Sequence, residues 1–175
     1  LTVSQMEAGS MVAIRHELEL LPMLEYAADQ LRGHAEQKQI TLATNLSAKL
    51  PTVIGDRDKL QAALLNLVGN AIKYTPENGQ VSVVLERHDN ALVGSVKDTG
   101  IGISEEVLEH IFEPFFTARS GGTGLGLYIS RELLELNRAT LLYLDRPGGA
   151  MFTRPAVDLV ARKHFDHHFK QFGLL

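Results

Sequence analysis

The segment 61–74, QAALLNLVGNAIKY, carries polar residues spaced to bind a metal ion and phosphate from one face of a helix. At about 100° per residue, Asn66, Asn70 and Lys73 gather on one side, with Lys59 earlier on that side. Carboxamide oxygens suit a hard cation such as Mg²⁺, and a Lys suits the phosphates that accompany it. The other side is an apolar stripe of Leu60, Leu64, Leu67, Val68, Ala71 and Ile72. The alternative is that both Asn side chains bond only water or a neighbouring loop.

A second group, DTGIGI at positions 98–103, combines one carboxylate with two glycines. The Asp98 carboxylate can accept a hydrogen bond from the exocyclic amine of a purine, and Gly100 and Gly102 let backbone pass close beneath a flat ligand. A dinucleotide-binding fingerprint would need a third Gly where this chain has Glu105. That fold is therefore excluded, and an ordinary tight turn is the remaining alternative.

A third group, GGTGLGL at positions 121–127, places four glycines at the start of a predicted helix. Backbone N–H groups at a helix start, on residues that let a phosphate come near, form a cradle for an anion. A Walker A loop is excluded, because Leu127 and Tyr128 follow Gly126 in place of Lys and Ser or Thr. A flexible loop before a capped helix is the alternative, which the density of glycines makes less favourable.

The elements that must position these groups are helices and strands in mixed order. Strands are expected at 11–19, 40–46, 81–87, 92–98, 140–144 and 150–153, the last four as two hairpins. Helices are expected from Pro22, from the N-cap Asp56 to Tyr74, from Ser104 to before Pro114, and from about Gly124 to about Asn137. This order does not give regular βαβ units. It predicts an α/β (α+β) two-layer sandwich, with a mixed, mostly antiparallel sheet and helices packed on one face.

Composition excludes several classes of protein. The 175 residues are 45% hydrophobic, which is enough for one compact domain with a core. The net charge of -4 gives no basic field to attract nucleic acid, and the absence of Cys excludes disulfides and thiolate metal sites. We find no apolar run of about 18 residues and no signal peptide. We therefore expect no nucleic acid and no membrane contact by this domain itself.

The three groups, together with IFEPFF at positions 111–116, resemble motifs of two-component sensor histidine kinases. NLVGNAIKY resembles the N box of that family, DTGIGI its G1 box, IFEPFF its F box and GGTGLGL its G2 box. All four stand in the family's order and at compatible spacing. The resemblance covers roughly 11–152 and implies the catalytic, ATP-binding domain of the Bergerat (HATPase) fold, with ATP and Mg²⁺ as cofactors.

The resemblance also implies roles for individual residues. Asn70 would hold Mg²⁺, with Asn66 beside it near the phosphates, and Asn66 and Lys73 would be the catalytic residues. Asp98 would bind the adenine amine, with Tyr74 along the nucleotide. The remaining cofactor-binding residues would be Gly100, Gly102 and Ile103 at the base, and Phe116, Arg119, Gly122, Thr123, Gly124, Leu125 and Gly126 in the ATP lid, which Phe112 and Phe115 would help to hinge and pack.

The reaction implied is transfer of the γ-phosphoryl group of MgATP to a histidine, which makes the chain part of an ATP-dependent protein-histidine kinase. Hydrolysing relatives, such as gyrase-type topoisomerases, have a Glu one turn before the magnesium Asn. Asn66 has no usable basicity at that place, which favours a kinase over an ATPase. The expected partners are a histidine-containing dimerisation domain and, downstream, a response regulator. The expected location is the cytoplasm, and membrane anchoring of the parent protein stays open.

The expected division of the chain is 1–10 as the remnant of the second dimerisation helix or linker, 11–155 as the catalytic domain and 156–175 as a C-terminal extension. The acceptor histidine is not expected here: the sequence after His16 departs from the family's phosphorylation motif. The spacing of His164, His167 and His168 matches no closed metal site, which favours a solvated tail.

Two other functions on the same fold stay open. The first is a nucleotide-gated interaction module that binds ATP and moves its lid without phosphorylating a target. The second is an anti-sigma-type protein-serine kinase, against which the helical character of 1–9 argues.

Overall fold

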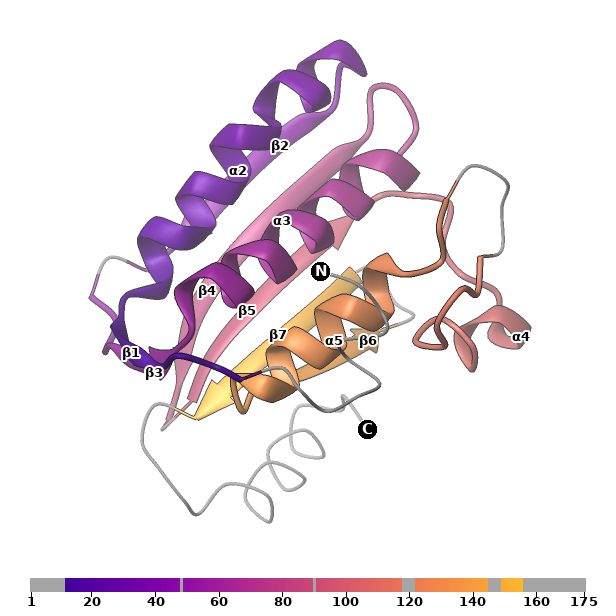
Figure 1. The fold of residues 1–175 in the computed structure, drawn as a ribbon. Helices are drawn as coiled ribbons and strands as arrows, with labels where there is room; N and C mark the ends of the chain where they lie inside the picture. The colour runs from indigo at the N-terminus through magenta and orange to yellow at the C-terminus, as the bar shows by residue number, and fades with distance from the viewer. Residues whose placement is uncertain (1–11, 48, 90, 118–121, 145–148, 156–175) are drawn as a thin grey trace.

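The computed structural model describes residues 12–47, 49–89, 91–117, 122–144 and 149–155. A five-stranded sheet is covered on one face by three helices (Figure 1). These helices are α2 (Leu20–Gln37), α3 (Arg57–Tyr74) and α5 (Gly126–Leu136), and the short α4 (Glu105–Leu108) lies to one side of them.

The sheet has the order β2-β4-β5-β7-β6. Its strands are β2 (Thr41–Leu46), β4 (Gln80–His88), β5 (Ala91–Asp98), β6 (Thr140–Leu144) and β7 (Gly149–Pro155). The β2/β4 pair is parallel, and the β4/β5, β5/β7 and β6/β7 pairs are antiparallel. The predicted two-layer fold with a mixed, mostly antiparallel sheet is therefore confirmed.

The core forms where the sheet meets the helices. Alternate residues of β4 and β5 are buried beneath the helical layer: Val81, Val83, Leu85, Leu92 and Val96. The predicted apolar stripe of α3 is buried against them: Leu60, Leu64, Leu67, Val68, Ala71 and Ile72. Ala63, which the prediction left out, is buried with them. Each large aliphatic side chain buried in this way contributes about 1.5–3 kcal/mol relative to an exposed one. This burial fixes which face of α3 remains for other contacts.

Both ends of α3 have the expected caps. Oδ1 of Asp56 accepts a hydrogen bond from the backbone N–H of Lys59 at 3.1 Å, which satisfies one of the free donors of the first turn. At the other end Thr75 has extended backbone, with φ -82° and ψ 129°, as a residue before Pro requires. The helix therefore stops at Tyr74, one residue after Lys73.

Several predicted boundaries were wrong. The helix expected from Ser104 to before Pro114 is observed only as α4, which ends at Leu108. The strand predicted at 11–19 is observed only as β1 (His16–Leu18). It pairs with β3 (Val53–Gly55), which was not predicted, in a separate two-stranded sheet. Helix α2 begins at Leu20, two residues before Pro22, because Pro is tolerated anywhere in the first turn, where N–H groups lack helical partners. Helix α5 begins at Gly126.

The described helices include none that is both long and apolar enough to cross a membrane.

Candidate functional site

The last turns of α3 present their polar residues away from the core. Asn66 and Asn70 are half-buried, and Lys73 and Tyr74 are exposed. Lys59 does not belong to this group, since its Nζ atom bonds Oδ2 of Asp56 at 2.7 Å. The polar face of α3 that is free for a ligand therefore lies in its C-terminal half.

The turn after β5 lies against the end of α3. Oδ1 of Asp98 accepts a hydrogen bond from the backbone N–H of Gly100 at 2.8 Å, and the N–H of Ile101 donates to the carbonyl oxygen of Tyr74 at 3.4 Å. A Cβ atom on Gly100 would lie 2.9 Å from that same carbonyl oxygen. Gly100 is therefore required for the close approach of the Asp98 turn to α3.

Gly102 serves a different purpose from Gly100. Its φ is +70°, in the left-handed region that side chains disfavour, and a Cβ atom there would meet nothing within 4 Å. The positive φ, and not a lack of space for a side chain, therefore explains why Gly stands at position 102. Ile103, which follows it, is half-buried.

The glycine loop before α5 reaches the side chains at the end of α3. A Cβ atom placed on Gly122 would lie 3.5 Å from Nζ of Lys73 and 4.0 Å from the hydroxyl of Tyr74. The same point is 3.7 Å from the hydroxyl of Thr117. Nζ of Lys73 also lies 5.1 Å from the centre of the Tyr74 ring, a cation–π contact. A cation, two hydroxyls and an exposed glycine backbone therefore meet at one place.

Gly124 packs against the backbone of the phenylalanine pair. Its φ is +67°, and a Cβ atom there would lie 2.6 Å from the carbonyl oxygens of both Phe115 and Phe116. Phe115 itself has φ +64° and a 63% exposed side chain. This contact between the F-box and G2-box segments is therefore made by backbone.

The start of α5 lies against Asn66. Nδ2 of Asn66 donates a hydrogen bond to the buried hydroxyl of Ser130 at 2.8 Å. A Cβ atom on Gly126 would lie 2.7 Å from Oδ1 of Asn66. Ahead of α5, the backbone N–H of Leu125 donates to the hydroxyl of Thr123 at 3.4 Å. Asn66 therefore faces the glycine-rich helix start.

The structure thus brings the N-box, G1-box and G2-box segments together around the C-terminal half of α3. Arg119 and Gly121 lie outside the described residues, as do the His-rich segment and the region 1–10. Sequence reasoning missed Thr117 and Ser130. Neither stands at a spacing that would reveal its contact, because Thr117 lies near Gly122 and Ser130 meets Asn66 only in the folded chain.

Two titratable groups near these segments have shifted pKa values. Burial acts to raise the pKa of Asp56, but hydrogen bonds from Lys59 and from the backbone N–H of Ile14 outweigh it and lower the pKa below its ordinary value. A hydrogen bond from its ring Nδ1 to the carboxylate of Glu113 raises the pKa of the exposed His110. The His110 ring also contacts Phe116, with ring centres 5.4 Å apart.

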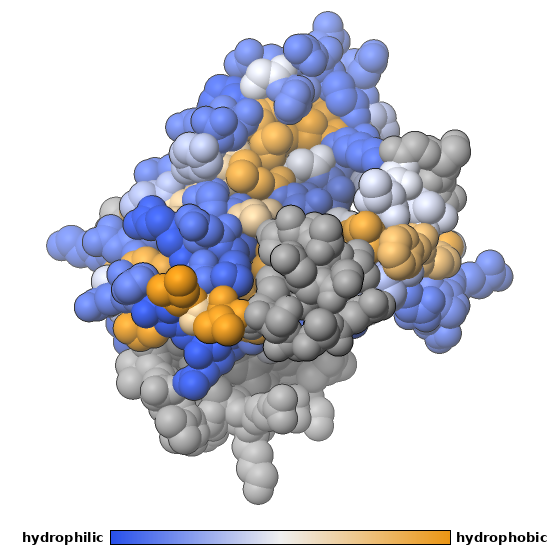
Figure 2. All heavy atoms as spheres, in the orientation of Figure 1, coloured by the Kyte–Doolittle hydropathy of each residue, from blue (hydrophilic) through white to orange (hydrophobic). Residues whose placement is uncertain are grey.

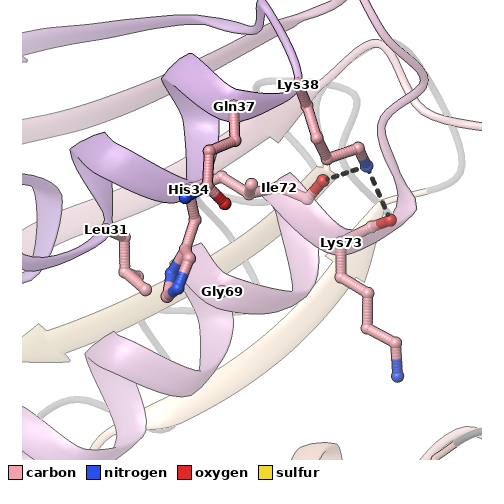
Figure 3. A pocket seen from close by; sticks show the side chains of 7 residues that line it. All are labelled: Leu31, His34, Gln37, Lys38, Gly69, Ile72 and Lys73. Carbon is pink, nitrogen blue, oxygen red and sulfur yellow. Dashed lines mark hydrogen bonds between the residues drawn. The ribbon is translucent and has the colours of Figure 1, made fainter.

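A groove of about 270 Å³ lies on another side of α3, against α2 (Figure 3). Figure 2 shows an apolar strip bordered by hydrophilic residues on this face. The groove is lined by Leu31, His34, Gln37, Lys38, Gly69, Ile72 and Lys73. It shares only Lys73 with the site described above, so it is a separate feature.

The described residues contain no group of three or more His, Cys, Asp or Glu side chains placed to hold a metal ion. The groups at the site that suit a hard cation are the carboxamide oxygens of Asn66 and Asn70. Because Asn66 uses its Nδ2 atom to bond Ser130, its Oδ1 atom is left as an acceptor. This donor set fits Mg²⁺ that is also bound by the phosphates of a ligand.

Comparison with known proteins identifies a family and individual relatives. A family model for histidine kinase-, DNA gyrase B-, and HSP90-like ATPases matches residues 55–159. The hybrid signal transduction protein dokA of Dictyostelium discoideum is 39% identical over 150 residues, which make up 78% of this chain and 9% of dokA. The signal transduction histidine-protein kinase BarA of Escherichia coli (strain K12) is 36% identical over 159 residues, 84% of this chain and 17% of BarA. The chain thus spans a small part of the length of these relatives.

Solved structures with the same fold include three from histidine kinases. The catalytic domain of histidine kinase ThkA matches with a TM-score of 0.75 and 30% identity, over 82% of this chain and 96% of that domain. Full-length ShkA in complex with AMPPNP matches with a TM-score of 0.77 and 28% identity, over 90% of this chain and 34% of ShkA. ThkA in complex with the response regulator protein TrrA matches with a TM-score of 0.73 and 27% identity, over 89% of this chain and 46% of that chain.

Proposed function

Because this chain belongs to the histidine kinase-, DNA gyrase B- and HSP90-like ATPases, as the ATP-binding catalytic domain of a histidine kinase, we propose that it transfers the γ-phosphoryl group of MgATP to a histidine on a dimerisation domain. The observation that carries the proposal is the meeting of Lys73, Tyr74 and Gly122 beside the Asp98 turn. Tyr74 and Gly122 are 48 positions apart and belong to two separate motifs. Together with Lys73 they offer one ligand a cation and an exposed glycine backbone.

The adenine end of the nucleotide lies at the Asp98 turn. One oxygen of Asp98 is held by the N–H of Gly100, which fixes the direction of the carboxylate. The carboxylate then accepts a hydrogen bond from the exocyclic amine of adenine. Gly100, Gly102 and Ile103 form the floor beneath the base, and Tyr74 lies along the nucleotide.

The phosphate end lies between α3 and the glycine loop. Lys73 neutralises phosphate charge, and the backbone N–H groups from Gly122 to Gly126 donate to phosphate oxygens. Thr123, Leu125 and the Phe116 segment shape the loop around them, and Arg119 adds a second cation. These groups position the γ-phosphorus for attack, which is the main protein contribution to phosphoryl transfer.

Asn70 holds Mg²⁺ through its amide oxygen, with Asn66 beside it. Mg²⁺ held by these amides would neutralise the charge that develops on the phosphate oxygens. A ring nitrogen of the acceptor histidine attacks the γ-phosphorus, a P–N bond forms, the bond to the bridging oxygen breaks, and ADP leaves. Asn66 cannot remove a proton from water, so hydrolysis by a base at this position is not supported.

A response regulator is the proposed partner downstream of this domain. ThkA has been solved in complex with a response regulator protein, and we propose that a response regulator also receives the phosphoryl group from the histidine phosphorylated here. The domain acts in the cytoplasm, where ATP is available. Residues 11–155 form the catalytic unit in this proposal, with 1–10 as the end of a dimerisation helix or linker and 156–175 as an extension.

The test is transfer in trans. The chain is mixed with a histidine kinase dimerisation domain and γ-labelled MgATP, and label should appear on that domain as an acid-labile, base-stable phosphohistidine. A His-to-Gln variant of the dimerisation domain is the control and should stay unlabelled. Nucleotide binding without any transfer to several such domains would favour a nucleotide-gated module, and acid-stable label would favour a serine kinase.

A further inference from the structure

Lys38 follows the last residue of α2, and its side chain reaches across to the C-terminal end of α3. Its ammonium group donates to the carbonyl oxygens of Ile72 at 2.8 Å, Lys73 at 3.0 Å and Thr75 at 2.5 Å. Figure 3 shows the side chain directed at the first two of these. An ammonium group has three N–H donors, and all three are used here.

The three carbonyl groups are ones that α3 cannot satisfy by itself. The last four C=O groups of a helix have no helical partner, and they carry the negative end of the helix dipole. A half-buried cation at this place therefore satisfies the acceptors and opposes the dipole at once. The backbone of Lys38 is also held in place, since its carbonyl oxygen accepts a hydrogen bond from the backbone N–H of Asn78 at 3.2 Å.

The peptide units that Lys38 holds are the ones that carry the nucleotide-facing groups. Lys73 and Tyr74 lie between its first and last acceptors, and their side chains reach Gly122. The carbonyl oxygen of Tyr74, within the same turn, accepts from the N–H of Ile101. One ammonium group thus fixes the turn against which both the Asp98 turn and the glycine loop are placed.

We propose that Lys38 is a positioning residue of the nucleotide site. It holds the last turn of α3 so that Lys73, Tyr74 and the Asp98 turn keep the spacing that binds nucleotide, without touching the nucleotide itself. This inference rests on the proposed function, because its effect is read through nucleotide affinity.

The first test compares the Kd for MgADP of wild type and variants by calorimetry, at a temperature where every variant is fully folded. Lys38→Met, which keeps the length of the side chain and removes the donors, should weaken binding by about five- to tenfold. Lys38→Arg should bind more tightly than Lys38→Met, because a guanidinium keeps the charge and several donors. Lys49→Met, at an exposed lysine outside the site, should bind like wild type. A lower unfolding temperature alone would not change the Kd of folded protein.

The second test needs no nucleotide. Amide hydrogen exchange of the Thr75 and Ile101 N–H groups should be faster in Lys38→Met, with no change at Val83 in the centre of β4. If Lys38→Met does not fold, Lys38→Gln, which keeps one amide donor group, replaces it in both tests.

Unchanged affinity in Lys38→Met, or an Arg variant no better than the Met variant, would overturn the inference while leaving the proposed function standing. Absence of nucleotide binding by wild type would instead overturn the proposed function. In that case the exchange data still decide whether Lys38 holds the end of α3.

Discussion

Nδ2 of Asn66, on α3, donates a hydrogen bond of 2.8 Å to the hydroxyl of Ser130, on α5. Ser130 is fully buried and Asn66 is half-buried, so the Ser130 end of this bond is shielded from water. It joins the helix that carries the polar site residues to the helix that begins at the glycine loop. It also fixes the amide of Asn66, so that its oxygen is left facing Gly126.

The Asn66–Ser130 bond should appear as a coupling free energy. We expect a double-mutant cycle of Asn66→Ala and Ser130→Ala to give about 0.5–1.5 kcal/mol, measured by urea unfolding, because each single change leaves the other partner unsatisfied. The control cycle pairs Asn66→Ala with Ser82→Ala, on β4, and should be additive. Additivity in both cycles would show that the bond contributes nothing.

Gly126→Ala should destabilise the protein, because the added methyl group would lie 2.7 Å from Oδ1 of Asn66. We expect a loss of about 1–3 kcal/mol in the free energy of unfolding. Gly33→Ala is the matched control, since Gly33 lies within α2 with nothing within 4 Å of the added atom. That change should stabilise by about 0.5–1 kcal/mol. Equal effects of the two substitutions would contradict the close contact with Asn66.

Gly124→Ala and Gly102→Ala separate crowding from backbone strain. Both residues have positive φ, +67° and +70°, but only Gly124 faces the backbone of Phe115 and Phe116. We expect Gly102→Ala to cost about 1–2 kcal/mol from backbone strain alone, and Gly124→Ala to cost more and to weaken nucleotide binding. Thermal unfolding and calorimetry measure the two effects, and a larger cost at Gly102 would refute this distinction.

Asp56 should make stability depend on pH in acid. Its pKa is lowered below the ordinary value of 3.8, so the stabilisation is present above that value and is lost as the pH falls through the folded-state pKa. Asp56→Asn keeps an N-cap acceptor and removes the charge beside Lys59. We expect wild type to be more stable than Asp56→Asn at about pH 6, and the difference to shrink towards about pH 3 in urea unfolding curves. Ser82→Ala, which changes no charge, is the control, and its difference from wild type should stay constant with pH. A constant gap between wild type and Asp56→Asn would contradict the lowered pKa.

Local patterns predicted much of the fold. The β4/β5 hairpin follows from two runs rich in Val and Leu on both sides of a short polar turn, and its observed register pairs Val81 with Asp98. The extent and buried face of α3 follow from helical periodicity, the Asp56 cap and Thr75 before Pro76. These features depend on neighbours in the chain, which a sequence displays directly.

Features that depend on distant partners were not predictable. β3 has three residues and exists because it pairs with β1, and a run that short has no recognisable period. The contact of Asn66 with Ser130 joins residues 64 positions apart. The role of Lys38 could not be predicted from the sequence, because a lysine at the end of a helix is usually an ordinary surface residue. Its contact with the end of α3 exists only in the folded protein.

The most direct test of nucleotide recognition at the Asp98 turn is the relative affinity for ATP and inosine triphosphate, measured by calorimetry with Mg²⁺ on wild type and Asp98→Asn. Inosine triphosphate lacks the exocyclic amine that Asp98 is proposed to bind. Asn keeps an oxygen for the N–H of Gly100, so the turn itself should persist. We predict that wild type prefers ATP by about tenfold and that Asp98→Asn loses this preference. The same preference in both proteins, or no binding of either nucleotide by wild type, would contradict it.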